Sequence, residues 1–184
     1  MNVGEKHYCS KCMRETEEYG VCPHCGYDPD DLTESFCIEE GTLFQNGRYE
    51  LGAVIGQGGF GITYAAWDMV LDIPVAIKEY FPSEYCKRNT EESDDIEIIN
   101  KYFYIGLQTF IREAQILATL QNVSTVVQVY DCFEKNNTAY IIMEYVRGET
   151  LWEISQKQKI KSAELLTLLR PVFDDLILFH KDGV

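Results

Sequence analysis

Four cysteines near the N-terminus have the spacing of a metal site. They form two C-x-x-C pairs separated by nine residues: Cys9, Cys12, Cys22 and Cys25. Two such pairs can bring four thiolates around one zinc ion, and because they leave no ligand position open, we expect the zinc to be structural. Free thiols or a redox pair are the alternative, but the segment is too short and too polar to fold without a metal. His24 lies inside the second pair and is not expected to be a ligand.

A glycine-rich segment further along the chain is typical of phosphate binding. Gly56, Gly58 and Gly61 form the sequence G-Q-G-G-F-G. Glycines at the tip of a hairpin let backbone N–H groups approach phosphate oxygens closely. Dinucleotide-binding turns share this pattern, but there the glycines open a helix. Here the strand-like sequence I-T-Y-A-A-W follows, so the pattern favours a phosphate-binding hairpin.

Two charged residues could act together with the glycines. Lys78 ends the sequence V-A-I-K, seventeen residues beyond Gly61, on what should be the next strand. Its ammonium group could reach phosphates held by the glycine loop. Glu113 belongs to a stretch with helical periodicity and could orient the lysine. Taken singly, each is more often a solvated charge and each glycine a turn residue. The occurrence of the glycines, the lysine and the glutamate together and in this order favours a nucleotide site.

The elements that must position these residues form an α+β pattern. Strands are expected in five segments: 48–56, 62–68, 73–80, 126–133 and 138–145. Helices are expected at 107–120 and 162–179. One helix between the third and fourth strands predicts a helix packed on an antiparallel sheet. The irregular, acidic stretch from Pro82 to Ile105 could be an extra helix or a docking surface.

Changes in composition divide the chain into three regions. We expect a zinc ribbon at 7–28, an acidic linker at 29–47 and a larger domain at 48–184. The formal net charge of −14 argues against binding of nucleic acid or of an anionic membrane surface. The sequence has no signal peptide and no apolar window of membrane-spanning length. Seven cysteines, an odd number, favour a reducing compartment, so this segment is expected to be cytoplasmic.

Several motifs of the third region resemble those of protein kinases. I-G-Q-G-G-F-G-I-T-Y resembles the glycine-rich loop, V-A-I-K the third-strand lysine motif and F-I-R-E-A the helix that bears the ion-pair glutamate. Y-I-I-M-E-Y-V-R-G resembles the fifth strand and the hinge. The order is that of the family from about Arg48 to Val184, and bacterial serine/threonine kinases are the most similar group. The resemblance implies a kinase-like N-lobe, with a five-stranded antiparallel sheet and one helix, followed by the first helices of the C-lobe.

The resemblance also implies a set of ATP contacts. Lys78, paired with Glu113, would hold the α- and β-phosphates beneath the glycine loop. The other contacts would line the adenine pocket and the hinge: Ile55, Thr63, Ala76, Met143, Glu144 and Val146. Among these, Met143 would be the gatekeeper, and Glu144 and Val146 would bind adenine through their backbone. Thr63 stands where the family usually has valine.

The implied activity is ATP-dependent phosphorylation of serine or threonine hydroxyls in proteins, with ATP and Mg²⁺ as cofactors. The family's catalytic base and magnesium ligands belong to H-R-D and D-F-G motifs, which this sequence does not contain. We therefore expect these ligands to lie outside this chain, and the chain by itself to be inactive. One alternative is a pseudokinase or nucleotide-binding scaffold, although that class often loses the lysine or the loop glycines. Another is a zinc-ribbon adaptor for a nucleic acid or a protein partner.

Overall fold

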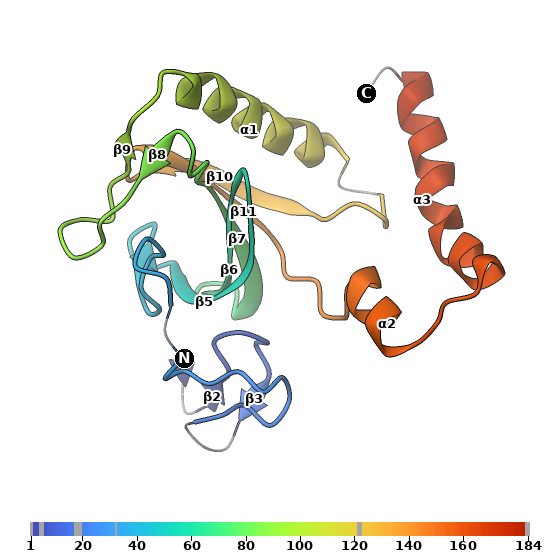
Figure 1. Cartoon of the computed structure of the whole chain (residues 1–184), viewed down its shortest axis with the longest axis horizontal. Coiled ribbons are helices and arrows are strands. Elements are labelled where there is room, and N and C mark those ends of the chain that lie inside the picture. The colour runs from blue at the N-terminus through green and yellow to red at the C-terminus, as the bar shows by residue number, and fades with distance from the viewer. Residues whose placement is uncertain (1, 4–5, 17–19, 32, 121–122, 183–184) are drawn as a thin grey trace.

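The computed structural model describes residues 2–3, 6–16, 20–31, 33–120 and 123–182 (Figure 1). In this part of the chain, a small three-stranded sheet at the N-terminus is followed by a six-stranded antiparallel sheet. One helix crosses the larger sheet, and two more follow the last strand. The predicted α+β class, with a helix on an antiparallel sheet, is therefore confirmed.

The larger sheet contains all five predicted strands. Its strand order is β10-β11-β7-β6-β5-β4. The bounds are β4 (Leu43–Phe44), β5 (Tyr49–Gly58), β6 (Gly61–Asp68), β7 (Ile73–Tyr80), β10 (Val129–Lys135) and β11 (Thr138–Glu144). The short strand β4 was not predicted, because it lies in the region 29–47 that composition indicated was a linker. The sheet therefore has six strands rather than five.

Strict alternation gives the sheet two different faces. Lys78 pairs with Thr63 of β6 on one side and with Ile141 of β11 on the other, so these side chains share one face, here called the Lys78 face. Glu79 pairs in the same way with Ile62 and Tyr140 on the opposite face, the Glu79 face. Because side chains alternate along β7, the predicted site and most of the large buried side chains lie on different faces.

Helix α1 (Tyr102–Thr119) fixes one end of β7. Its buried Phe103 and Phe110 pack around the ring of Tyr80, with centroid separations of 5.0 and 5.4 Å. The helix begins five residues before the predicted start at Leu107. Gly106 looks like a helix breaker in the sequence, but a Cβ there would lie 1.9 Å from the Tyr80 hydroxyl oxygen. The glycine is thus required by the packing of the helix against the sheet.

The stretch 81–100 and the end of the region 29–47 together cover the Glu79 face. They contain the small hairpin of β8 (Cys86–Lys87) and β9 (Glu97–Ile98). They also contribute buried apolar side chains to the core: Cys37, Ile38, Phe44, Phe81, Cys86 and Ile96. The expected extra helix is therefore wrong: from 81 to 100 the insertion forms a short hairpin with a mostly exposed loop at 89–95, and only its last residues begin α1. A docking role for this stretch stays a prediction.

Two further helices follow β11. Helix α2 (Leu151–Lys157) was not predicted, and it begins with a capping box between Thr150 and Glu153. Helix α3 (Ser162–Asp182) was predicted, and the Thr125 hydroxyl donates to the carboxylate of Asp175 in it at 2.5 Å. In Figure 1 both helices stand apart from the large sheet. Among the helices of the described residues, none has both the length and the apolarity needed to span a membrane.

Candidate functional site

The three predicted glycines lie in one hairpin. Strand β5 ends at Gly58 and β6 begins at Gly61. A Cβ at Gly61 would lie 2.1 Å from the carbonyl oxygen of Glu79, so only glycine fits against β7. A Cβ at Gly58 would meet no atom within 4 Å, and one at Gly56 would only touch Thr63. The backbone at the tip is therefore open to a ligand, whereas Gly61 is required by packing.

Lys78 and Glu113 meet beside this hairpin. The ammonium nitrogen of Lys78 lies 3.3 Å from a carboxylate oxygen of Glu113 and 5.5 Å from the centre of the Phe110 ring. The lysine comes from near the end of β7 and the glutamate from the middle of α1, so packing of the helix on the sheet brings them together. Their side chains are 31% and 51% exposed, so the pair adds little to stability. The positive charge of Lys78 remains accessible to an anionic ligand.

Of the residues predicted for the adenine pocket, Thr63 lies directly beside Lys78, and Ala76 and Met143 lie two residues further along the same face. Met143 pairs directly with Ala76, and Ala76 is buried. Ile55 and Val146 are exposed, with Ile55 at the start of the glycine hairpin and Val146 just after β11. The N–H of Glu144 donates to the Gln128 carbonyl at 2.8 Å. Because this N–H is already paired, the carbonyl of Glu144 is the group that could accept a hydrogen bond from the amino group of adenine.

The four predicted cysteines form a compact cluster. They lie in a ribbon built on β1 (Asn2–Val3), β2 (Lys6–Tyr8) and β3 (Glu15–Thr16). All four sulfurs lie within 4.8 Å of one another, and the Cys9–Cys25 and Cys12–Cys22 separations are both 3.7 Å. Zinc–sulfur bonds of about 2.3 Å imply tetrahedral edges of about 3.8 Å. The cluster therefore fits the geometry of a zinc ion.

The loops around the sulfurs have the backbone of metal-binding knuckles. The N–H of Cys12 points to the sulfur of Cys9 at 3.5 Å, and the N–H of Gly26 donates to the carbonyl of Cys22 at 2.8 Å. Gly26 has a φ of 70°, which favours glycine. His24 is exposed and contacts the backbone carbonyl of Glu15 at 3.2 Å. It lies outside the cluster, as predicted.

The electrostatic environment differs among the sulfurs. Burial raises the pKa of Cys9 and of Cys12. Burial also acts to raise the pKa of Cys22, but the N–H groups of His24 and Cys25 outweigh it and lower that pKa to about 7. The second knuckle therefore stabilises a thiolate, which is the form that binds a metal.

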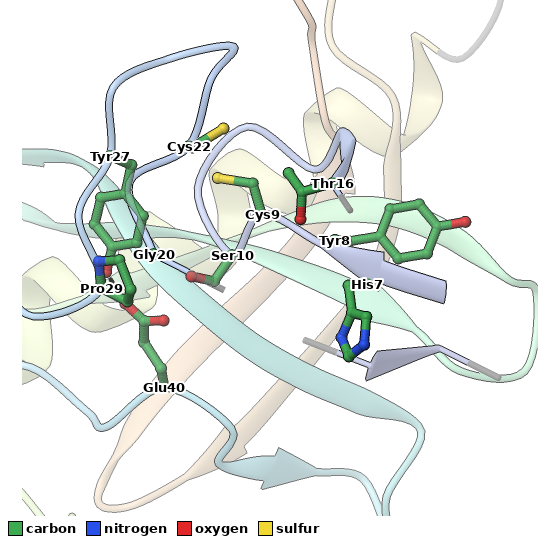
Figure 2. Close-up of a pocket in the computed structure, with 10 residues that line it drawn as sticks. All are labelled: His7, Tyr8, Cys9, Ser10, Thr16, Gly20, Cys22, Tyr27, Pro29 and Glu40. Carbon is green, nitrogen blue, oxygen red and sulfur yellow. Dashed lines mark hydrogen bonds between the residues drawn. The ribbon is translucent and has the colours of Figure 1, made fainter. Parts of the chain in front are cut away.

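A cavity of about 140 Å³ lies between the two cysteine loops of the ribbon and is lined by Cys9 and Cys22, among others (Figure 2). The sulfurs of Cys9 and Cys22 point into the same space between the two loops, while His7 lies away from them on its strand. The Tyr27 hydroxyl donates to the carboxylate of Glu40 at the cavity edge. This bond attaches the second knuckle to the segment that leads into the large sheet.

Two side chains that follow β11 make contacts that were not predicted from the sequence. The hydroxyl of Tyr145 donates to the Lys11 carbonyl at 2.9 Å, and the guanidinium of Arg147 donates to the Met13 carbonyl at 3.1 Å. These contacts join residues 134 positions apart in the chain. Tyr145 and Arg147 both fall in the hinge motif Y-I-I-M-E-Y-V-R-G, but nothing in that motif indicates a partner in the ribbon.

The N-terminal lobe of a protein kinase is defined by a glycine hairpin, a strand lysine paired with a helix glutamate, and a hinge. The comparison with protein families agrees, because residues 49–184 match the protein kinase domain. This chain therefore belongs to the protein kinase domain family.

Its relatives include bacterial serine/threonine kinases. The chain is 29% identical over 160 residues to serine/threonine-protein kinase B of Synechocystis, a match that covers 84% of the chain and 26% of that kinase. It is 31% identical over 140 residues to PrkC of Bacillus subtilis, covering 76% of the chain and 19% of PrkC. The solved apo form of PpkA-294 superposes with a TM-score of 0.72 at 34% identity, covering 81% of this chain and 53% of that one. The chain thus spans about a quarter or less of the two curated relatives.

Proposed function

We propose that this chain provides the ATP-binding lobe of a protein serine/threonine kinase. The observation that carries the proposal is the Lys78–Glu113 pair, 3.3 Å apart beside an open glycine hairpin. Lysine suits this task because it is a compact positive charge on a flexible stem, and a carboxylate fixes where that stem points.

In this proposal each part of the Lys78 face has its own role. The hairpin N–H groups and Lys78 hold the phosphates of ATP, and the hinge backbone at Glu144 and Val146 binds adenine. Ile55, Thr63, Ala76 and Met143 surround the base. The catalytic base and the ligands of Mg²⁺, which neutralises charge on the phosphates when bound, come from residues outside this chain.

The proposed partners are ATP and protein substrates with serine or threonine hydroxyl groups. We also propose a cytoplasmic location for this segment, supported by an odd number of cysteines that suits metal ligands and thiols better than disulfides. The proposed zinc ribbon at 7–28 and kinase domain at 48–184 are joined by residues 29–47, and the part of this join from Phe36 onward packs against the core of the sheet.

The test of this function is phosphate transfer by the full-length protein, meaning a protein that contains this chain together with the catalytic base and the ligands of Mg²⁺. Incubation with ATP and Mg²⁺ should place phosphate on protein serine or threonine, located by mass spectrometry of the products. Phosphate on tyrosine alone would contradict the proposed specificity. Tight ATP binding with no transfer would indicate instead a pseudokinase or nucleotide-binding scaffold.

We further propose that the cysteine cluster binds one structural zinc ion. Elemental analysis of the purified protein should find about one zinc per chain, because four cysteines complete a tetrahedral site. Replacing Cys22 and Cys25 together with serine should remove the metal and unfold the ribbon. Cys132→Ser, which changes an exposed cysteine outside the cluster, should retain it. Stoichiometric disulfides in a metal-free protein would contradict this proposal.

A further inference from the structure

The ribbon is docked on the kinase domain by three backbone carbonyls of its first knuckle. Each carbonyl accepts one bond from the kinase domain: Ser10 from the Ala53 N–H at 2.8 Å, Lys11 from the Tyr145 hydroxyl at 2.9 Å and Met13 from the Arg147 guanidinium at 3.1 Å. All three lie within or directly after the pair Cys9 and Cys12. The conformation of the knuckle therefore decides whether the three bonds can form together.

Close apolar packing accompanies these bonds. The Met13 side chain is fully buried against Ala65 and Trp67, and the rings of Tyr8 and Trp67 lie 4.4 Å apart. The backbone of β5 comes so near the ribbon that a Cβ on Gly52 would lie 2.3 Å from the Ser10 carbonyl oxygen. The ribbon is thus closely packed on the sheet rather than suspended from a linker.

The docking site includes the hinge. Tyr145 and Arg147 lie on either side of Val146, whose backbone is proposed to bind adenine. Figure 1 shows the ribbon beneath β5 and beside the segment that connects β11 to α2. The Glu144 N–H is already held by Gln128 on the sheet side. The hinge is therefore held at one point through its backbone, by the residue just before β10, and at two points through its side chains, by the ribbon.

We propose that the ribbon positions the hinge for ATP, with Tyr145 and Arg147 as positioning residues and the metal-bound knuckle as their support. This inference rests on the proposed kinase function. When the metal is present, Cys9 and Cys12 fix the knuckle and its carbonyls hold both hinge side chains. When the metal is lost, the bonds are lost, the hinge gains freedom and adenine binds less tightly. The phosphates and their lysine are unaffected.

Trp67 reports on the docking without reference to activity. The chain has two tryptophans, and Trp152 is 70% exposed, so Trp152→Phe leaves Trp67 as the single reporter. Removing the metal from this 184-residue variant with a chelator should shift the Trp67 emission to longer wavelength, because Tyr8 and Met13 no longer shield the ring. Readdition of zinc should reverse the shift. Metal loss with unchanged Trp67 emission would show that the metal does not hold the ribbon, and would overturn the proposal.

Kinetics of the full-length protein test the hinge. Tyr145→Phe keeps the ring and removes only the donor, so the KM for ATP should rise about threefold, and Tyr145→Phe with Arg147→Met should raise it about tenfold. The value of kcat should stay within about twofold, since the phosphate contacts are intact. The matched control is Tyr104→Phe, an exposed tyrosine of α1, which should leave both constants unchanged.

The cysteine variants should act through the same contacts. Cys22→Ser with Cys25→Ser should raise the KM for ATP by a similar factor, and adding Tyr145→Phe should raise it no further. An unchanged KM in the Tyr145→Phe, Arg147→Met protein, or a loss of kcat alone, would overturn the inference. A wild-type protein with no affinity for ATP would refute the proposed function itself, and the inference with it.

Discussion

Replacing Lys78 with methionine is expected to lower phosphate transfer by about 100- to 1000-fold while the protein stays folded. Catalysis of phosphate transfer depends mostly on positioning and charge stabilisation, so loss of a charge over the phosphates is costly. Stability should hardly change, because the Lys78 side chain is 31% exposed and its partner is half exposed. The measurement is kcat/KM of the full-length protein, with thermal melts to check the fold.

The partner of Lys78 is tested in the same series. Glu113→Gln should reduce activity less than Lys78→Met, because the lysine keeps its charge but loses its orientation. The double variant should be no worse than Lys78→Met alone, since the two residues act as a unit. Lys101→Met, at a lysine just before α1, is the control and should be near wild type. A folded Lys78→Met protein with normal turnover would contradict the role of this lysine, and additive losses would contradict the pairing with Glu113.

Local sequence patterns sufficed for the parts of the site that lie on single elements. Alternation in I-P-V-A-I-K-E-Y predicted β7, and the glycines predicted the turn between β5 and β6. The pairing of Lys78 with Glu113 was suggested by the helical stretch around Glu113 and then by the family resemblance, because a gap of 35 residues gives no local signal of contact. The hinge contacts of Tyr145 were missed for the same reason, since their partner lies in the ribbon.

The segments that cover the Glu79 face, 81–100 and the end of 29–47, were predicted least well. Arg88 lies in an irregular, acidic stretch, where a charge is usually solvated, yet its side chain is 0% exposed. One signal was available. Alternation along β7 places Glu79 on the same face as Val75 and Ile77, both fully buried, and a carboxylate among such residues requires a partner. The sequence could not say which of the distant basic residues would supply it.

Arg88 and Glu79 form the centre of a buried hydrogen-bond network. Arg88 binds both carboxylate oxygens of Glu79 and donates to the carbonyls of Asp94 and Phe36 at 2.7 and 3.0 Å. Burial acts to lower the pKa of Arg88, but the bonds with Glu79 outweigh it and raise that pKa above its ordinary value. The guanidinium thus stays charged and ties the insertion and the segment before β4 to the sheet.

The carboxylate of Glu79 has two further donors on the sheet. The hydroxyls of Tyr140 and Tyr64 donate to it at 2.7 and 3.1 Å. Burial, and then the charge of Glu79, raise the pKa of both tyrosines, so they remain neutral donors. Two neutral hydroxyls cannot replace a guanidinium, and a carboxylate left without Arg88 would be a poorly compensated buried charge.

Arg88→Met should therefore destabilise the protein by about 3–5 kcal/mol, an effect much larger than that of most single substitutions. Lys87→Met is the matched control, because the neighbouring Lys87 pairs with Glu97 at 3.1 Å on the surface, with both side chains more than 60% exposed. Surface pairs of this kind contribute about 0–1 kcal/mol. The measurement is urea unfolding of the 184-residue chain carrying Trp152→Phe, followed by Trp67 emission.

Adding Glu79→Gln to Arg88→Met should recover more than half of the loss. The amide oxygen can still accept from one of the two tyrosine hydroxyls and the amide NH2 can donate to the other, while the uncompensated charge is gone. The two substitutions should therefore be strongly non-additive. Glu79→Gln alone should cost less than Arg88→Met, because the guanidinium keeps its two backbone carbonyls. If Arg88→Met and Lys87→Met lower the free energy of unfolding by the same amount, the buried pair does not hold the covering segments on the sheet. If the double variant is as unstable as the sum of the single ones, the cost comes from lost packing of the arginine side chain on Phe81 rather than from a stranded carboxylate.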